Sequence, residues 1–569
     1  MELTGAQMVW ECLIREGVDV VFGYPGGSII DTYDAMIDYP IRHVLVRHEQ
    51  GAAHAADGYA RSTGKVGVCI ATSGPGATNL VTGIATAYMD SVPMVAITGQ
   101  VSTAVLGRDG FQETDITGIT LPITKHNFLV SEISELPQAF IEAFHIARTG
   151  RPGPVLIDLP RNVAMSKAEF SYPDKVDLPG YRPTQRGNVR QLRMAAELLN
   201  AAARPLIIAG GGVNRAGAFE ALAALAEKYR APVAMTLLGI GGFPQSHPRS
   251  LGFMGMHGAA SANMAVDKAD LVLAVGMRFS DRVTGKASAW APNAKIVHID
   301  VDPAEVGKNV APTVPIVGDA NLVLQQLLPL VQPCEFEPWW SLIDEWRQEE
   351  RSRDILKHET EELLPPFVVS RISALTEGQA MMVSDVGQNQ MWEAQYYSHD
   401  LPRSLCTSGG LGTMGYGIPA AMGVQVGNPD KQVWMVAGDG GTQMTLNQWG
   451  TIAQEKLPIK MAILNNGYLG MVRQWQQMFF SSRYAATPIG SPDFVRLAEA
   501  YGIPGLIVTT REEVDDAIRA AIAHPGPFII EFRVKGEENV YPMVPAGQTV
   551  REMIRRPLPS ERCLPEEAK

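Results

Sequence analysis

The sequence predicts an α/β protein made of three doubly wound domains, each with a parallel sheet. Its 569 residues exceed the length at which one hydrophobic core stops growing. Short β-rich runs alternate with helical runs along the chain, which is typical of parallel sheets. A polar stretch from Ser171 to Arg190 and a charged segment from Trp346 to Glu362 interrupt this alternation. We therefore expect domains at residues 1–170, 190–332 and 364–545, followed by a C-terminal tail at 546–569.

The expected strands are short runs of apolar and β-branched residues. They are Val18 to Phe22, Arg42 to Val46, Gly67 to Ala71, Met94 to Thr98 and Val155 to Asp158 in the first block; Pro205 to Ala209, Val233 to Thr236, Leu271 to Val275 and Ile296 to Asp300 in the second; and Met381 to Ser384, Val433 to Ala437, Lys460 to Leu464 and Phe528 to Phe532 in the third. Ligands of open parallel sheets bind beyond the carboxyl ends of the strands. We therefore expect the functional residues at the carboxyl ends of these strands.

Composition excludes several kinds of function. The formal charge of −12 and the pI near 5.5 provide no positive field for nucleic acid. The five cysteines are odd in number and lack CxxC spacing, so they favour neither disulfides nor zinc but a reducing cytoplasm. No signal-peptide pattern opens the chain, and the uncharged stretch from Ser404 to Pro429 is too rich in glycine to predict a membrane span. We expect a cytoplasmic protein with neither a nucleic-acid nor a membrane partner.

Two strand ends in the third block carry metal-binding chemistry. Gly438, Asp439, Gly440 and Gly441 follow one strand, and Asn466 and Tyr468 follow the next. A right-handed crossover brings both ends to the same edge of the sheet. There Asp439, Asn466 and the carbonyl of Tyr468 can bind Mg²⁺, while the glycines let the backbone approach phosphate oxygens. A GDG alone would indicate only a turn, but its pairing with a strand-ending NN favours a metal site.

Glu49 stands where a strand ends and an alanine-rich helix begins. The helix dipole favours a carboxylate at that position, and this is the simplest explanation of Glu49 taken alone. A tight glycine- and proline-containing turn, Thr72 to Asn79, follows the next predicted strand.

The GDG and NN motifs together resemble the diphosphate and metal motif of thiamine-diphosphate enzymes. The resemblance implies that Glu49 binds the pyrimidine N1′ and favours the imino form, whose N4′ removes the C2 proton of the thiazolium. It also implies that Met414 holds the cofactor in a bent conformation. Further cofactor contacts implied by the family are Pro75, Asn79, Val386, Gly387, Gln388 and Met471.

Nearly the whole chain is similar to acetohydroxyacid synthase large subunits. The matching blocks are Phe22 to Gly27, Arg47 to Gly51, Phe111 to Glu113, Thr124 to Asn127, Arg151 to Pro154 and Leu469 to Trp475. The resemblance implies that the Gly27 backbone lies near the reacting centre and that Gln112 and Lys125 line the substrate approach. Phe111 and Trp475 are expected to shape the substrate pocket. Lys125 is explained equally well as an ordinary polar side chain.

The second block resembles the flavin domain of the biosynthetic members of this family. Gly210, Gly211 and Gly212 follow a strand but do not form GxGxxG, because Arg215 occupies the place of the third glycine. Asp300 is expected to accept a bond from an adenosine hydroxyl, and Arg278 and Arg282 to balance diphosphate charge. The remaining implied FAD contacts are Arg151, Thr236, Leu237, Met256, His257, Gly276 and Asp319. Ser280 replaces the first Asp of the family's RFDDR, which weakens the flavin inference modestly.

The resemblance implies a fold with a central flavin-binding domain and three cofactors: thiamine diphosphate, Mg²⁺ and FAD. The implied reaction joins pyruvate to pyruvate or 2-oxobutyrate, the first common step of branched-chain amino acid biosynthesis. The implied assembly is a homodimer or a dimer of dimers with a small regulatory subunit. A flavin-free catabolic synthase, pyruvate oxidase, glyoxylate carboligase and a catalytically silent regulatory protein are the alternatives. Glu49 argues against glyoxylate carboligase, and the retention of Glu49, Asp439 and Asn466 argues against a silent protein.

Overall fold

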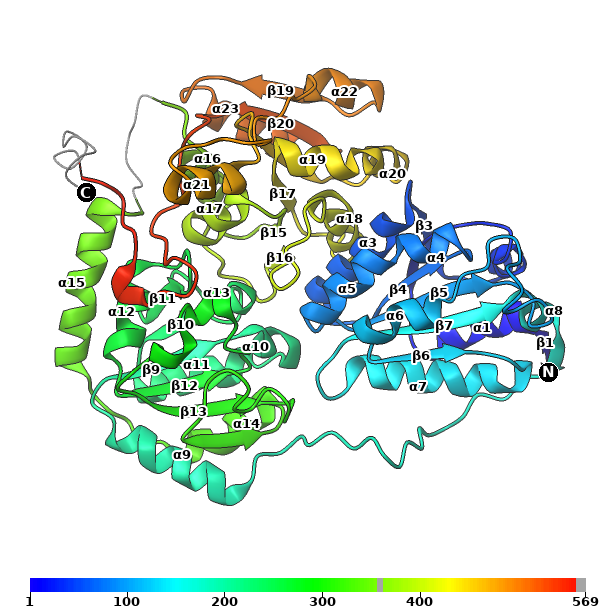
Figure 1. Ribbon diagram of the computed structural model, residues 1–569, viewed down its shortest axis with the longest axis horizontal. Helices are drawn as coiled ribbons and strands as arrows, with labels where there is room; N and C mark the ends of the chain where they lie inside the picture. Colours follow the sequence, from blue (N-terminus) through cyan, green and yellow to red (C-terminus); the bar gives the residue numbers. More distant parts are fainter. Residues whose placement is uncertain (356–361, 559–569) are drawn as a thin grey trace.

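A computed structural model describes residues 1–355 and 362–558 of the chain. In that part of the chain three six-stranded parallel sheets form three lobes (Figure 1), so the predicted fold class is confirmed. The polar stretch between Ser171 and Asn188 runs as an extended connection from the first lobe to the second, as expected of a linker. Residues 356–361, in the predicted charged segment, and 559–569, in the predicted tail, lie outside the described residues.

The first sheet has the order β3-β2-β4-β5-β7-β6. Its strands are β2 (Val20–Tyr24), β3 (Arg42–Leu45), β4 (Gly67–Ala71), β5 (Met94–Gln100), β6 (His126–Leu129) and β7 (Pro154–Pro160). Helices α1 (Gly5–Arg15) and α7 (Leu136–Arg148) bury their apolar sides on one face. Helices α3 (Glu49–Thr63) and α5 (Val81–Met89) cover the other face. A short antiparallel pair, β1 (Glu2–Thr4) with β8 (Lys167–Glu169), stands apart from the sheet.

The second sheet has the order β11-β10-β9-β12-β13-β14. Its strands are β9 (Pro205–Ala209), β10 (Val233–Met235), β11 (Ser250–Phe253), β12 (Leu271–Val275), β13 (Lys295–Asp300) and β14 (Val314–Val317). The main helices around it are α9 (Val189–Ala201), α10 (Gly211–Ala216), α11 (Phe219–Tyr229), α12 (Ala260–Lys268), α14 (Ala320–Leu327) and α15 (Glu337–Arg353). Residues 546–558 return to this lobe (Figure 1), where Arg551 pairs with Asp267 at 3.0 Å.

The third sheet has the order β16-β15-β17-β18-β20-β19. Its strands are β15 (Met381–Ser384), β16 (Leu405–Thr407), β17 (Val433–Gly438), β18 (Lys460–Asn465), β19 (Gly505–Val508) and β20 (Phe528–Arg533). Its main helices are α16 (Pro365–Leu375), α17 (Gln388–Tyr396), α18 (Gly417–Gly427), α19 (Asp439–Thr445), α20 (Trp449–Gln454), α21 (Gly470–Phe479), α22 (Phe494–Ala500) and α23 (Val514–Ala523). A 3-10 turn, Leu446–Gln448, directly precedes α20 in the crossover between β17 and β18.

The first and third lobes share one hydrophobic core because α3 and α18 pack directly on each other. The helices meet at small residues: a Cβ on Gly58 would overlap the backbone carbonyl of Ala420, and one on Gly423 would overlap that of Ala55. This close approach explains why α3 is rich in alanine and glycine. Glu49, the first residue of α3, is thereby held on a helix packed against the third lobe.

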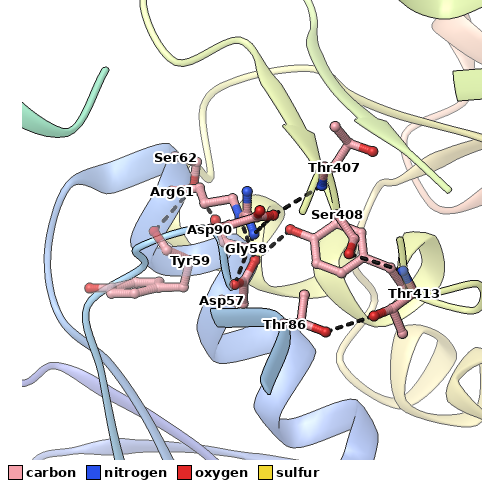
Figure 2. A network of polar contacts seen from close by, with 12 residues as sticks. Asp57, Gly58, Tyr59, Arg61, Ser62, Thr86, Asp90, Thr407, Ser408 and Thr413 are labelled. Atoms are coloured by element: carbon pink, nitrogen blue, oxygen red, sulfur yellow. Dashed lines mark hydrogen bonds and ion pairs between the residues drawn. The ribbon is translucent and has the colours of Figure 1, made fainter. Parts of the chain in front are cut away.

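A buried polar network reinforces the same interface (Figure 2). The Arg61 guanidinium on α3 binds Asp57 at 2.5 Å and Asp90 at 2.9 Å. Tyr416 donates to Asp57 at 2.6 Å, and the amides of Gly409 and Gly410 donate to Asp90 at 3.0 and 2.7 Å. Each carboxylate therefore has a cationic partner and further donors, which offsets the cost of burying its charge.

Candidate active site

The predicted metal ligands converge at the carboxyl edge of the third sheet. Strands β17 and β18 are parallel neighbours, so Asp439 and Asn466 follow adjacent strand ends. The buried Asp439 carboxyl accepts a 2.8 Å bond from Ser491 through one oxygen. Its other oxygen is buried and has no hydrogen-bond partner among the described residues. Burial raises the pKa of this carboxyl, and the hydrogen bond from Ser491 opposes the rise. A buried, partly unsatisfied carboxylate beside an amide oxygen fits a hard cation.

Asn466 and Tyr468 form a tight turn directly after β18. The amide of Tyr468 donates to the side-chain oxygen of Asn466 at 3.0 Å, which orients that side chain. The Asn466 amide nitrogen lies 3.5 Å from the side-chain oxygen of Gln388. Among the described residues no cluster of three His, Cys, Asp or Glu could hold a metal. The predicted site is consistent with that, since it contains one carboxylate, one amide and one carbonyl.

Met414 lies next to the glycines of this site. A Cβ on Gly440 would lie 3.6 Å from the Met414 methyl group. The buried Asp385 carboxylate accepts the amides of Gly415 at 3.1 Å and Gly417 at 2.8 Å, which fixes the loop that carries Met414. Burial raises the pKa of Asp385 to about 6. Asp385 was not among the predicted site residues, although it directly follows a predicted strand, a position that indicates a site residue.

The predicted pyrimidine-side residues gather on the first sheet. Asn79 donates to the Glu49 carboxylate at 2.9 Å. Pro75 opens the helical turn that ends at Asn79, and a Cβ on Gly76 would lie 3.3 Å from the other Glu49 oxygen. Gln112 has a left-handed backbone with φ of 59°, and its carbonyl lies against Gly74. Gly27 faces open space. Glu49, Asn79 and Gln112 therefore belong to one local cluster.

Phe111 and Lys125 differ strongly in exposure. The Phe111 side chain is 89% exposed. The Lys125 ammonium instead donates to the carbonyls of Ile146 and Thr149, the latter at 2.8 Å, and to the Tyr181 hydroxyl at 3.0 Å. Burial lowers the pKa of Lys125 to about 8. These bonds connect the end of α7 to the linker, so Lys125 has a structural role. Its assignment to the substrate approach stays a prediction.

A cavity of about 740 Å³ is lined by residues of all three lobes, mainly of the second and third, with Asp90 and Arg151 from the first. Its lining includes most of the predicted flavin contacts: Arg151, Gly211, Gly212, Thr236, Leu237, Met256, His257, Gly276, Arg278, Arg282, Asp300 and Asp319. It also includes five residues predicted to contact thiamine diphosphate or substrate: Val386, Gly387, Met414, Met471 and Trp475. Part of the predicted thiamine-diphosphate region therefore shares this space with the predicted flavin contacts, whereas Gln388, Asp439, Asn466 and Tyr468 do not line it. None of Glu49, Gly27, Phe111, Gln112, Lys125, Pro75 and Asn79 belongs to this lining.

The glycine turn after β9 lets the backbone form one wall of the cavity. A Cβ on Gly210 would overlap the carbonyl of Gly276, and one on Gly212 would lie 2.6 Å from the Gly276 Cα. Only glycines fit this backbone contact. Gly210 itself lies behind the cavity wall, where it supports Gly211 and Gly212.

Several charged side chains that line the cavity already bind other groups of the protein. Arg151 pairs with Glu305 at 2.7 Å and Asp302 at 3.3 Å. Asp319 caps α14 through the Leu322 amide at 3.0 Å, and Asp300 accepts the amide of Asp302 at 2.9 Å. Arg282 lies over the Trp475 ring at 6.0 Å from its centroid, which joins the second lobe to the third.

Arg215 also lines the cavity, although our sequence analysis treated it only as a departure from GxGxxG. Its Nε has no hydrogen-bond partner in the described part of the chain, and the same holds for His257 Nδ1. Burial lowers the pKa of Arg215 to about 10. Since Arg215 Nη2 donates to the Asp90 carbonyl at 3.3 Å, the buried guanidinium is only partly satisfied. Such a guanidinium, together with the His257 nitrogen, fits a polar, anionic ligand.

Three family models match the chain in order. Residues 3–119 match the N-terminal TPP binding domain of thiamine pyrophosphate enzymes, residues 192–327 the central domain, and residues 385–532 the C-terminal TPP binding domain. No described helix is long and apolar enough to cross a membrane.

Similar proteins share almost the full length of this chain. The acetolactate synthase large subunit of Corynebacterium glutamicum is 49% identical over 560 residues, which cover 96% of this chain and 89% of that protein. The acetolactate synthase of Arthrospira platensis is 49% identical and covers 97% and 98%. The acetolactate synthase isozyme 3 large subunit of Escherichia coli is 46% identical with the same coverage. The chain therefore belongs to the acetolactate synthase large subunits, a family of thiamine pyrophosphate enzymes.

Proposed function

We propose that this chain is the catalytic subunit that decarboxylates pyruvate and joins the remaining two-carbon unit to a second 2-oxo acid. With pyruvate as acceptor the product is 2-acetolactate, and with 2-oxobutyrate it is 2-aceto-2-hydroxybutyrate. The observation that carries the proposal is the buried, unsatisfied Asp439 oxygen beside Asn466, within a chain that belongs to this family. We place the reaction in the cytoplasm, at the first common step of valine, leucine and isoleucine biosynthesis.

Asp439, Asn466 and the Tyr468 carbonyl would hold Mg²⁺ together with the diphosphate of thiamine diphosphate. The cofactor, when bound, supplies an acidic carbon that adds to the 2-oxo carbonyl and accommodates the electron pair left by departing carbon dioxide. Glu49 would hold a proton between its carboxylate and the pyrimidine N1′. The bond from Asn79 fixes one Glu49 oxygen and leaves the other for this contact. Met414 and the Val386–Gly387 backbone would orient the ring system.

The second-lobe cavity would hold FAD. Its volume of about 740 Å³ lies in the range of small-molecule sites. Arg278, Arg282 and Arg215 would neutralise diphosphate charge, and Asp300 and Asp319 can accept bonds from ribose hydroxyls. A flavin absorbance spectrum of the purified protein separates this proposal from a flavin-free catabolic enzyme.

A complete site is proposed to need two copies of the chain, as a homodimer or a dimer of dimers. In one chain the Glu49 cluster is not part of the cavity that Met414 and Trp475 line. Large apolar side chains are exposed on both parts, including Phe111 at 89%, Leu121 at 69%, Met444 at 58% and Val472 at 50%. Exposed patches of this kind are typical of interfaces. The designation of relatives as large subunits supports a small regulatory subunit as a further partner.

Product analysis tests the proposed reaction directly. Purified protein is incubated with thiamine diphosphate, Mg²⁺, FAD and pyruvate, with and without 2-oxobutyrate, and the products are identified by mass spectrometry. We expect acetolactate in the first case and both acetohydroxy acids in the second. Free acetaldehyde or acetate as the main product would contradict the carboligase assignment.

Mixing two inactive variants tests the shared site. Glu49→Ala and Asn466→Ala, mixed under conditions that exchange subunits, should regain part of the activity, because a mixed dimer contains one site with both wild-type residues. Verified exchange without recovery would mean that one chain builds each site alone.

A further inference from the structure

Asp158 is a buried carboxylate to which the proposed reaction assigns no role. It lies in β7 near the carboxyl edge of the first sheet and is 1% exposed. One oxygen accepts the Thr98 hydroxyl at 2.8 Å, and the other accepts the Gln100 amide at 2.9 Å. No lysine or arginine pairs with it among the described residues, and burial raises the pKa of Asp158 to about 7. An apolar residue would be less costly at such a position in a sheet.

Gln100 connects this carboxylate to a loop. Its amide nitrogen donates one hydrogen to Asp158 and the other to the backbone carbonyl of Thr114 at 2.8 Å. Its side-chain oxygen accepts the Val101 amide at 2.8 Å. The amide group of Gln100 thus has both donors and its acceptor engaged. Because Val101 and Thr114 stand at the two ends of the loop, Gln100 closes the base of the loop on Asp158.

Further bonds hold the rest of the loop. Thr103 donates its amide to the Asn162 side chain at 2.9 Å, and Asn162 donates back to the Thr103 hydroxyl at 3.0 Å. The Glu113 carboxylate accepts the amides of Gly107 and Gly110, the latter at 2.7 Å. The loop is therefore tied at its base and cross-linked within itself, and Gln112 lies two residues before Thr114, next to the base.

The end of the loop that carries Gln112 reaches the Glu49 cluster through direct contacts. A Cβ on Gly74 would lie 2.8 Å from the Gln112 carbonyl oxygen. The Gln112 backbone therefore packs against the turn from Thr72 to Asn79. Two residues later, a Cβ on Gly76 would lie 3.3 Å from the Glu49 carboxylate. Gln112 holds a positive φ of 59°, which a residue with a side chain keeps only where its surroundings enforce it. The loop restraints provide this enforcement.

We propose that Asp158 is a positioning residue, which acts through Gln100 to fix the loop that presents Gln112 beside Glu49. Asp158 does not touch the substrate; it holds the base of the segment that does. The inference rests on the proposed function only in assigning Gln112 to the substrate approach. Loss of the restraint should raise the KM for pyruvate more than it lowers kcat, because the Glu49–Asn79 contact does not involve the loop.

The test compares variants that break different bonds to the same carboxylate. Asp158→Ala removes both bonds, and Gln100→Met breaks the bridge while the Thr98 bond remains. Asp158→Asn retains an acceptor for Gln100 and is the conservative rescue. Thr98→Val is the matched control, since it removes a bond of similar length that does not lead to the loop. We expect kcat/KM for pyruvate to fall about tenfold in Asp158→Ala and Gln100→Met, as for the loss of a buried hydrogen bond, and to stay within about twofold in the other two.

Two further readouts separate positioning from general destabilisation. Hydrogen exchange of the peptide covering residues 104–114 should accelerate in Asp158→Ala and Gln100→Met but not in Thr98→Val. In a Gln112→Ala background, Gln100→Met should cause little additional loss, because effects through a shared residue are not additive. Additive losses, or unchanged exchange of the loop, would overturn the inference. A wild-type protein that forms no acetolactate would refute the proposed function, whereas the exchange experiment would still decide whether Asp158 restrains the loop.

Discussion

Replacing Asp439 by asparagine changes charge at the metal site with little change in shape. In the wild type one carboxylate oxygen accepts the Ser491 hydroxyl at 2.8 Å, and the other is buried with no partner within residues 1–355 and 362–558. The asparagine has a single oxygen, which is neutral, to offer to the metal. The fold should survive, since the Ser491 hydroxyl can bind either atom of an amide.

The expected loss follows from the charge that disappears. A unit charge about 4 Å from a carboxylate interacts with it by about 4 kcal/mol at an effective dielectric constant near 20. The remaining oxygen ligands and water recover part of this, so we expect a net loss of about 3 kcal/mol. Because 1.36 kcal/mol corresponds to a factor of ten, Mg²⁺-dependent affinity for thiamine diphosphate should fall about a hundredfold.

Equilibrium dialysis of thiamine diphosphate across a Mg²⁺ titration measures this loss without requiring catalysis. Ser491→Ala is the control, because it removes the neighbouring hydrogen bond and keeps the charge; its affinity should change only a few-fold. Circular dichroism establishes that both variants are folded. Wild-type affinity with full Mg²⁺ dependence in Asp439→Asn would refute the assignment of Asp439 as a ligand.

Three other predictions concern proton transfer, selectivity and stability. Glu49→Gln should retain cofactor affinity but slow exchange of the C2 hydrogen for deuterium, followed by NMR; wild-type exchange would rule out the proposed role. Trp475→Leu should lower the ratio of acetohydroxybutyrate to acetolactate in competition by about tenfold, since one methylene is worth roughly 1 to 3 kcal/mol; an unchanged ratio would make Trp475 a packing residue. Burial raises the pKa of Asp158 to about 7, so the folded state binds the extra proton and wild-type stability falls as pH rises from about 4 to 7. The free energy of unfolding of Asp158→Asn relative to that of the wild type should therefore rise by about 2 kcal/mol between pH 5 and pH 7, as measured by denaturant unfolding. A difference that does not change with pH would contradict the raised pKa of Asp158.

The sheets were predictable from sequence where their strands are buried on both sides. Every strand that the sequence predicted is present, with bounds that differ by at most a few residues; β4, β9, β12 and β15 match at both ends. The strands that were missed include β6, β11, β14, β16 and β19, and all five lie at sheet edges. Edge strands have one neighbour and one open side: β6 has only exposed and half-buried positions, and β19, although apolar in sequence, has a single buried position.

The candidate site was predictable where its residues follow strand ends. Asp439, Asn466 and Glu49 each stand directly after a strand or at the first turn of the following helix, and topology alone places such residues at a sheet edge. Asp90 carries no such signal. Its partners Gly409 and Gly410 are 319 and 320 residues away, and only the packing of the lobes brings them together.

The α3 helix links the two halves of the candidate site within one chain. It begins at Glu49 and, three turns later, presents Arg61 to Asp57 and Asp90 (Figure 2). Asp90 holds Gly409 and Gly410, which precede Met414 in the same loop, and Thr86 of α5 contacts Thr413 at 2.8 Å. The position of Glu49 is thus tied through one helix to the loop that carries Met414. Since the helices meet backbone to backbone at Gly58 and Gly423, neither can shift along the other without a steric clash. If each site is formed by two copies, Glu49 and the Met414 loop of one chain belong to two different sites. The α3 helix of each chain then connects these two sites, so the packing between subunits must set the geometry of both.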